Sequence, residues 1–448
     1  MRFRPLAVAL ILTLAGAAGC SPHAAGPIAE EGFLPGGRAT AGSQGKIQHI
    51  VIVVQENRSF DNLFAKFPGA EGARYGKMHD GRTIPLRKSD LTIKTDLCHE
   101  YHCFRVEWDG GAMDGFDVAW YGTSTPSLLG TYAYQYVDPA QIQPYWAMAE
   151  QYVLGDHMFQ TQGAGSFTSH QDLIAGDTSL DAGESVIDAP WTGLPWGCDA
   201  PAGTSSPILT RYGTYEAVGG PFPCYTYPTI RDRLDAAKIS WKYYTPSMKK
   251  SGKVWNAFDA IKAVRYSSEW TTNVVSPETK IFHDISGGTL PAVSWVIPQF
   301  LNSDHPGAKD KNGPSWVASI VNAIGQSSAW SSTAIVIVWD DWGGLYDNVP
   351  PPQITYDNLG FRVPMIVVSP YARRGYVSHT QYEFASILKF IEENWNLPSL
   401  KRADVRANSI GDVFNFSQAA RKFTVIPALH SVEYFLRQKP SELPVDTE

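Results

Sequence analysis

The 448-residue chain has little positive charge, few cysteines and no apolar run long enough for a membrane-spanning helix. Its 37 Lys and Arg residues are outnumbered by 44 Asp and Glu residues, and the formal net charge is -7. A protein whose main partner is a nucleic acid needs a basic surface, so this balance argues against that class. No segment reaches the roughly 20 consecutive apolar residues that cross a bilayer, so we expect no transmembrane helix. Any anionic substrate must therefore be neutralised locally, inside its binding site.

The first twenty residues have the pattern of an export signal peptide. Two arginines precede an apolar run at positions 6–14, and small residues lead to Cys20. That ending resembles a bacterial lipoprotein cleavage site, although Ala17 replaces the usual aliphatic residue. We therefore expect export from a bacterial cytoplasm, with the product periplasmic, secreted or anchored to a membrane only through a lipid on Cys20. Residues 21–45, rich in Ala, Gly and Pro, are expected to form a flexible linker.

Four cysteines remain if Cys20 is removed or acylated. An even number in an exported chain favours two disulfides, most simply Cys98 with Cys103 and Cys198 with Cys224. The alternative is a metal cluster, but these spacings match no cysteine-based zinc pattern. Residues 177–227, with many Pro and Gly, are expected to form an irregular insertion that the second disulfide pins over one end of a sheet.

Short apolar runs that alternate with helical patterns predict an α/β fold with a mainly parallel central sheet flanked by helices. The domain is expected to span residues 46–448. Runs rich in Val and Ile predict strands covered on both faces, at residues 50–54, 293–297, 334–339 and 365–368. Amphipathic or apolar patterns predict helices at residues 228–239, 314–327 and 381–396.

Acidic and amide residues follow two of the predicted strands. Glu56 and Asn57 come soon after the first, and Asp340 and Asp341 come directly after the third. Because ligands of open parallel sheets bind beyond the carboxyl ends of the strands, these side chains could surround one divalent cation. The simpler alternative is an ion pair between Glu56 and Arg58, with the two aspartates capping a loop. Two acidic pairs at strand ends favour the cation.

Ser166 follows a glycine-rich turn, Gly163-Ala164-Gly165, and begins a predicted helix. The glycines allow a sharp turn close to a ligand, and the helix start favours an anion through its unpaired N–H groups. A hydroxyl held there beside a metal ion can lose its proton and attack phosphorus. The alternative is an ordinary helix N-cap. The segment lacks the G-x-S-x-G pattern of lipases, which argues against acyl hydrolysis by a Ser-His-Asp triad.

Four histidines lie in segments where an imidazole can contact phosphate oxygens or protonate a leaving group. His99, His102 and His305 lie in polar or turn-forming segments. His170 lies four residues after Ser166 and so on the same face of the predicted helix. For each of them a structural hydrogen bond is an equally good explanation.

Six motifs, in this order, resemble a bacterial phosphoesterase family that contains phosphatidylcholine-type phospholipases C and respiratory-burst-inhibiting acid phosphatases. The likeness covers nearly all of residues 46–398, and the motifs are IVIVVQENRSFDNLF, WDGGAMDGF, GSFTSHQDLIAG, GTLPAVSWVIP, VWDDWGGLYDNVPPP and GFRVPMIVVSPYARRGYV. The resemblance implies an alkaline-phosphatase-like α/β fold. The site roles that it implies are metal ligation by Glu56, Asn57, Asp340 and Asp341, nucleophilic attack by Ser166, and phosphate contacts from His99 and His305.

The expected activity is metal-dependent hydrolysis of phosphoric esters through a phosphoserine intermediate, with one divalent cation. We expect an exported acid phosphatase that acts on phosphomonoesters. The alternatives are a phospholipase C that cleaves phosphatidylcholine-type diesters and a non-catalytic surface or lipid-binding module.

Two departures from the family bear on this expectation. Asp347-Asn348 stands where many members have an Asp-His pair, so a leaving-group role there is in doubt. Many phospholipases C of the family carry extra C-terminal domains, whereas this sequence ends about fifty residues after the helix predicted at 381–396. This difference favours a compact phosphatase or a minimal phospholipase.

Overall fold

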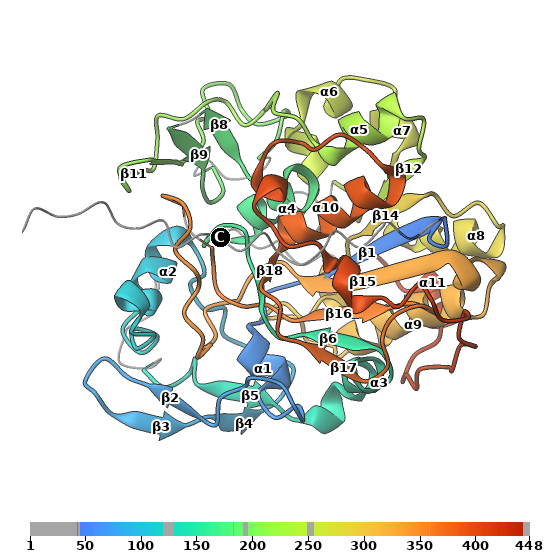
Figure 1. The fold of residues 1–448 in the computed structure, drawn as a ribbon. Coiled ribbons are helices and arrows are strands. Elements are labelled where there is room, and N and C mark those ends of the chain that lie inside the picture. Colours follow the sequence, from blue (N-terminus) through green and yellow to red (C-terminus); the bar gives the residue numbers. More distant parts are fainter. Residues whose placement is uncertain are drawn as a thin grey trace, which may run out of the picture. The chain divides into compact units, whose positions relative to one another are not determined.

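The computed structural model describes residue 43 and residues 45–119, 130–181, 183–190, 196–248, 255–357 and 359–441. The predicted signal peptide, Cys20 and the linker, apart from residues 43 and 45, lie outside these residues. The described residues belong to one structural unit, which spans positions 40–448. Figure 1 shows a central sheet in this unit with helices on both of its faces.

The central sheet has eight strands in the order β13-β12-β14-β1-β15-β16-β6-β17. β1 pairs in parallel with β14 on one side and with β15 on the other, whereas β16 runs antiparallel to both β15 and β6. The predicted α/β class with a mainly parallel sheet is confirmed. In chain order the strands are β1 (His49–Gln55), β6 (Val153–Gly155), β12 (Trp241–Tyr244), β13 (Val274–Val275), β14 (Val293–Val296), β15 (Thr333–Trp339), β16 (Met365–Val368) and β17 (Tyr376–Ser378).

The four strands predicted from apolar runs are β1, β14, β15 and β16, and they form the buried centre of the sheet. Every residue of β14, β15 and β16 is buried, and in β1 only His49 is partly exposed. Branched Val and Ile side chains suit a pleated surface that is covered on both faces, which explains why these runs do not alternate with polar residues.

The helices pack in two groups, one on each face of the sheet (Figure 1). One group contains α4 (Ser166–Ala175), α5 (Ile230–Ala236) and α10 (Phe384–Trp395), and the other contains α3 (Gln143–Gln151), α8 (Ile281–Ser286), α9 (Gly313–Gly325) and α11 (Val432–Arg437). The predicted helices at 228–239, 314–327 and 381–396 correspond to α5, α9 and α10. α10 begins with a capping box between Glu383 and Ser386 and ends at Asn396, which has a left-handed conformation.

The predicted insertion at residues 177–227 is more regular than expected. It contains a four-stranded sheet of β8 (Ser179–Asp181), β9 (Glu184–Val186), β10 (Ile208–Thr210) and β11 (Tyr215–Glu216), in the order β11-β10-β9-β8 with antiparallel neighbours. These strands are two or three residues long, too short for an apolar period to reveal them.

Both predicted disulfides, Cys98–Cys103 and Cys198–Cys224, are present. The alternative of a thiolate metal cluster is therefore wrong.

The remaining α-helices and strands of the described residues are short and lie around the sheet. They are α1 (Phe60–Phe64), α2 (Tyr101–Trp108), α6 (Lys262–Arg265), α7 (Glu269–Thr272), β2 (Tyr75–Lys77), β3 (Thr83–Pro85), β4 (Arg87–Ser89), β5 (Gln135–Val137), β7 (Met158–Phe159) and β18 (Tyr382–Glu383).

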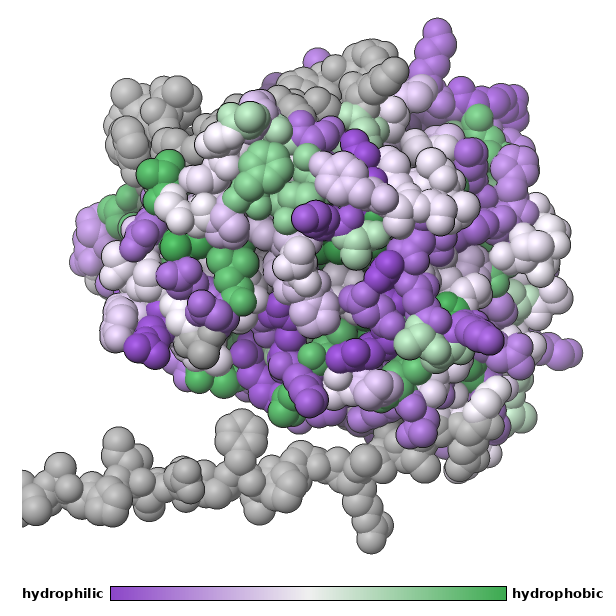
Figure 2. Space-filling model, turned by 90° about the horizontal axis from the view of Figure 1, so that it is seen from above, coloured by the Kyte–Doolittle hydropathy of each residue, from purple (hydrophilic) through white to green (hydrophobic). Residues whose placement is uncertain are grey.

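None of the helices formed by the described residues is long and apolar enough to cross a membrane. The face of the molecule in Figure 2 has apolar side chains scattered among polar ones. Scattered apolar side chains are normal on a protein surface and indicate no particular partner.

A buried ion pair fixes the loop that follows β15. The guanidinium of Arg362 donates from Nε to Asp347 Oδ1 at 2.8 Å and from Nη2 to Asn348 Oδ1 at 2.8 Å. Oδ1 of Asp61, on α1, lies 3.8 Å from Nη2 of the guanidinium. The side chains of Arg362, Asp61 and Asp347 are fully buried. Asn348, which stands where the motif of the resembling family often has a histidine, is therefore a hydrogen-bond acceptor for a buried arginine.

We expect Arg362→Met to lower the free energy of unfolding by about 3–5 kcal/mol, because it leaves two buried carboxylates without their cation. Denaturant titration measures this loss. The control is Arg82→Met, which breaks an ion pair between Arg82 and Asp80 on the surface, where both side chains are solvent-exposed. The control should leave the unfolding midpoint unchanged. Equal effects of the two substitutions would contradict a structural role for Arg362.

Candidate active site

Two polar pairs meet where β1 and β15 end. The strands are paired in parallel up to Gln55 opposite Trp339, so the chain leaves both at the same level. The backbone N–H of Asn57 donates to Asp340 Oδ1 at 2.9 Å, and Asn57 Nδ2 donates to Asp341 Oδ2 at 3.3 Å. The structure thus brings together all four residues predicted as metal ligands, Glu56, Asn57, Asp340 and Asp341, and buries them completely.

The backbone at Asn57 and Gly343 makes this approach possible. Asn57 has a φ of 57°, in the left-handed region that asparagine tolerates better than most residues, and this turns the chain sharply after β1. Gly343 has a φ of 60°, and a Cβ there would lie 2.4 Å from Asn57 O. A larger residue at position 343 would therefore push the two segments apart.

Ser166 contacts this group directly. It is the first residue of α4, and its Oγ donates to Asp341 Oδ2 at 3.0 Å. The serine side chain is fully buried, and Gly165 is the N-cap residue of the helix. The role of the glycines differs in part from the expected sharp turn beside a ligand. Gly163 allows close packing, because a Cβ there would lie 2.6 Å from the ring of Phe104.

His170 also belongs to this site, although the predicted site residues did not include it. Its Nε2 lies 3.2 Å from Glu56 Oε1 and 3.6 Å from Asp340 Oδ2. The spacing of four residues on α4 brings it to the same side as Ser166. Glu56, His170 and Asp340 form a fully buried group whose ligand atoms lie within 4.8 Å of one another. The spacing of four residues from Ser166 was the signal in the sequence that pointed to His170. That spacing does not reveal which carboxylates contact the histidine.

His99 and His305 lie beside the same group. His99 Nε2 is 2.9 Å from Asn57 Nδ2, and its Nδ1 is 2.6 Å from Leu97 O. The rings of His99 and His305 have centroids 6.3 Å apart, and both are buried. Together with Asp96 they form a second group with possible metal-ligand atoms within 4.8 Å of one another.

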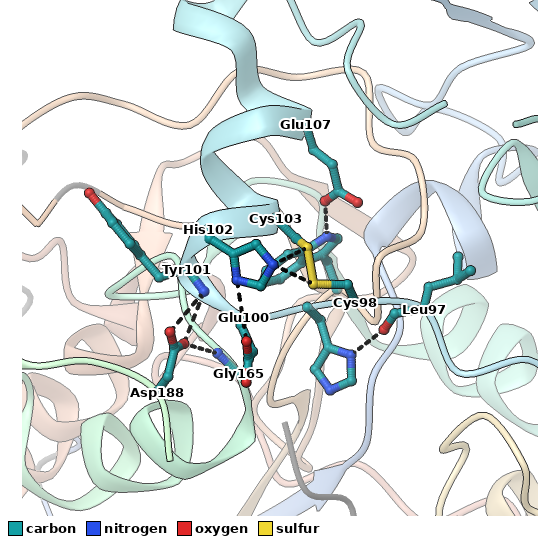
Figure 3. Close-up of a disulfide and its surroundings, with 11 residues drawn as sticks. Leu97, Cys98, Glu100, Tyr101, His102, Cys103, Glu107, Gly165 and Asp188 are labelled. Atoms are coloured by element: carbon teal, nitrogen blue, oxygen red, sulfur yellow. Dashed lines mark hydrogen bonds and ion pairs between the residues drawn. A yellow bond between two sulfur atoms is a disulfide. The ribbon is translucent and has the colours of Figure 1, made fainter. Parts of the chain in front are cut away.

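His102 does not face this site. Its side chain is about half exposed, and its ring contacts Glu100 and the sulfur atoms of the Cys98–Cys103 disulfide (Figure 3).

Arg58 supports the segment that carries His305. Its buried guanidinium donates from Nε to Asp304 O at 2.8 Å and from Nη2 to Leu91 O at 2.7 Å. Asp304 directly precedes His305, so Arg58 anchors the segment that carries this histidine. The sequence left open an ion pair between Arg58 and Glu56. In the structure the guanidinium of Arg58 instead donates to these main-chain oxygens.

The electrostatics of the site favour a bound cation. Burial, and then the charge of Glu56, raise the pKa of Asp340 to about 8. Asp340 Oδ2 is buried and makes no hydrogen bond within the described part of the chain. Carboxylate, amide and imidazole ligands together suit divalent cations such as Mg²⁺, Mn²⁺ or Zn²⁺. The residues present therefore fit a divalent metal ion, which would offset the buried negative charge.

The sequence of the chain has a specific match among known families. The Phosphoesterase family matches residues 47–398. Phospholipase C A of Mycobacterium tuberculosis is 26% identical over 471 residues, which cover 91% of this chain and 84% of that protein. Non-hemolytic phospholipase C of Pseudomonas aeruginosa is 25% identical over 431 residues, which cover 83% of this chain and 57% of that protein.

A plant protein and a solved structure extend the comparison. Non-specific phospholipase C6 of Arabidopsis thaliana is 25% identical over 407 residues, which cover 83% of this chain and 72% of that protein. A solved protein of the alkaline phosphatase superfamily from Vibrio parahaemolyticus is 11% identical, with a TM-score of 0.37 and coverage of 83% of this chain and 73% of its own.

The match and the named relatives define the class of protein: the chain is a phosphoric ester hydrolase, of the acid phosphatase or the phospholipase C type. It belongs to the Phosphoesterase family. The resemblance seen in the sequence motifs is thereby confirmed, and the alternative of a non-catalytic module is wrong.

Metal binding should release protons, because Asp340 with a pKa near 8 is largely protonated at neutral pH and must ionise to bind a cation. The affinity of the metal-free protein for Mn²⁺ or Zn²⁺ should therefore rise from about pH 6 to about pH 8 and then level off. Calorimetric titrations in two buffers with different ionisation enthalpies measure the protons released. The Asp340→Asn variant should bind more weakly and release fewer protons. An affinity independent of pH over this range would contradict a metal ligand at Asp340.

Proposed function

We propose that the protein is an exported, metal-dependent acid phosphatase that hydrolyses phosphomonoesters through a phosphoserine at Ser166. The observation that carries this proposal is the contact of 3.0 Å between Ser166 Oγ and Asp341 Oδ2, at the start of α4 and beside the other acidic residues. A hydroxyl in this position meets two requirements of a nucleophile: it is oriented by an acceptor, and it lies next to a group that can hold a cation.

The residues of the site divide the work of phosphoryl transfer. One divalent cation, held by Glu56, Asn57, Asp340 and Asp341, would lower the pKa of the Ser166 hydroxyl and stabilise negative charge on the phosphoryl oxygens. Ser166 Oγ attacks phosphorus in line, the bond to the leaving-group oxygen breaks, and water later cleaves the phosphoserine.

The surroundings of Ser166 stabilise the transferred group. The N–H groups in the first turn of α4 and the positive end of its dipole favour the phosphoryl oxygens. His99 and His305 contact the equatorial oxygens as well. The hydrogen bond between His99 and Asn57 ties one of these contacts to the metal site.

A small substrate agrees with the burial of the site. Ser166 and the four acidic and amide residues are fully buried, and His305 is only 2% exposed. A small phosphomonoester needs little surface around its phosphorus, whereas a phospholipid must also place two acyl chains.

The second candidate function is phospholipase C activity on phosphatidylcholine-type diesters. Its support is the set of relatives, which are named phospholipases C and align over most of this chain. Both functions share the attack on phosphorus, and they differ only in the groups that flank it.

Replacing Ser166 by Ala should reduce kcat by on the order of 10⁴-fold or more, because it removes the hydroxyl that forms the covalent intermediate. The assay uses metal-reconstituted protein and p-nitrophenyl phosphate. The matched control is Ser169→Ala on the same helix, where the buried hydroxyl accepts a hydrogen bond from Gln160 instead. The control should keep kcat within a few-fold. Phosphopeptide mass spectrometry after acid quenching should find a phosphoryl group on Ser166 of the wild type. An active Ser166→Ala protein would refute the assignment of Ser166 as the nucleophile.

Two substrates distinguish the candidate functions. The kcat/KM on p-nitrophenyl phosphate should exceed that on p-nitrophenylphosphorylcholine, because a monoester phosphatase recognises the phosphoryl group and not a choline. Both assays use the same metal-reconstituted sample, and the Ser166→Ala protein supplies the background rate for each. The reverse order would establish the phospholipase C alternative.

A further inference from the structure

One buried carboxylate connects the two loops that carry His99 and Ser166. Asp188 lies just after β9 and is fully buried. Its Oδ1 and Oδ2 accept from the backbone N–H of Tyr101 at 3.0 and 3.1 Å, and its Oδ1 also accepts from the backbone N–H of Gly165 at 3.4 Å. Figure 3 shows Asp188 facing both of these nitrogen atoms.

These two nitrogen atoms belong to the starts of two helices. Tyr101 is the first residue of α2, whose N-cap residue Glu100 makes no capping hydrogen bond with its side chain. Gly165 is the N-cap residue of α4 and has no side chain to cap the helix. Asp188 therefore provides the missing acceptor at both helix starts, where a negative charge is favoured.

Each helix start is next to a residue of the proposed mechanism. His99 lies two residues before Tyr101, within the loop closed by the Cys98–Cys103 disulfide. Ser166 directly follows Gly165. The ring of Phe104 on α2 also packs closely against Gly163 in the turn before α4, where a Cβ would lie 2.6 Å from that ring. A shift of Asp188 would consequently move His99 and Ser166 relative to each other.

The surroundings of Asp188 disfavour its ionised form. Burial, and then the charge of Glu100, raise its pKa to about 7, while the N–H groups of Tyr101 and Gly165 act in the opposite direction. His102, which pairs with Glu100 at 3.2 Å, also favours the carboxylate. A fully buried carboxylate at this place is stabilised chiefly by the two helix starts that it joins.

We propose that Asp188 is a positioning residue for phosphoryl transfer, which holds the His99 loop and the Ser166 helix start in their catalytic arrangement. This inference rests on the proposed function of the same site. Asp188 has no direct contact with the reacting atoms in this arrangement and acts through the backbone of Tyr101 and Gly165. Displacements of about 1 Å in a catalytic site can cost on the order of 10²-fold in rate, so the effect should be visible in kinetics.

The first test compares Asp188→Ala with the wild type as full-length, metal-reconstituted protein on p-nitrophenyl phosphate. We expect kcat to fall on the order of 10²-fold while the metal content by elemental analysis stays the same. Asp188→Asn, which retains one acceptor oxygen, should recover part of this loss. The matched control is Asp232→Ala, which removes the capping carboxylate of α5. The control should lower thermal stability without changing kcat.

A double-mutant cycle separates positioning from general destabilisation. Because Asp188 acts partly through His99, Asp188→Ala should cost less in a His99→Ala background than in the wild type. Additive losses, or an unchanged kcat in Asp188→Ala, would overturn the inference. If Asp188→Ala does not fold, the cycle with Asp188→Asn decides in the same way. An active Ser166→Ala protein refutes the proposed function, whereas an inactive one together with a fully active Asp188→Ala refutes only the role of Asp188.

Discussion

The parallel pairing of β1 with β15 is the constraint on which the rest of the site depends. Parallel neighbours end at the same edge of a sheet, and here both continue into acidic or amide residues. Three carboxylates, Glu56, Asp340 and Asp341, are thereby placed together with no exposure to solvent. Burying like charges in this way is unfavourable unless a cation or a proton compensates them. Burial, and then the charge of Glu56, accordingly raise the pKa of Asp340.

Longer connections complete the site around this edge. α4 supplies Ser166 and His170 from one face of the sheet, and the loop before α2 supplies His99. The insertion at residues 177–227 supplies Asp188, which bonds to the starts of both helices. The insertion therefore also connects the His99 loop and the start of α4, which are far apart in the sequence. Loops fixed by a rigid sheet commonly carry function in α/β proteins.

Much of the fold followed from local patterns. The long runs of Val and Ile predicted β1, β14, β15 and β16, since strands covered on both faces need continuous apolar sequence. The four cysteines that follow Cys20 predicted both disulfides. Strands of two or three residues, such as β8 and β11, gave no periodic signal. The antiparallel direction of β16 was equally invisible, because an apolar run has the same pattern in either direction.

The candidate site divides in the same way. The sequence indicated the class of chemistry through acidic and amide residues after strands, a serine after glycines at a helix start, histidines in polar loops, and the six motifs that resemble the phosphoesterase family. Only the tertiary structure decided that His170 lies against Glu56 and Asp340, that Arg58 anchors the segment of His305, and that Asp188 joins two helix starts. The physical reason is that a strand end or a helix start is encoded by neighbouring residues. The partner of a buried charge comes from wherever the folded chain places a complementary group.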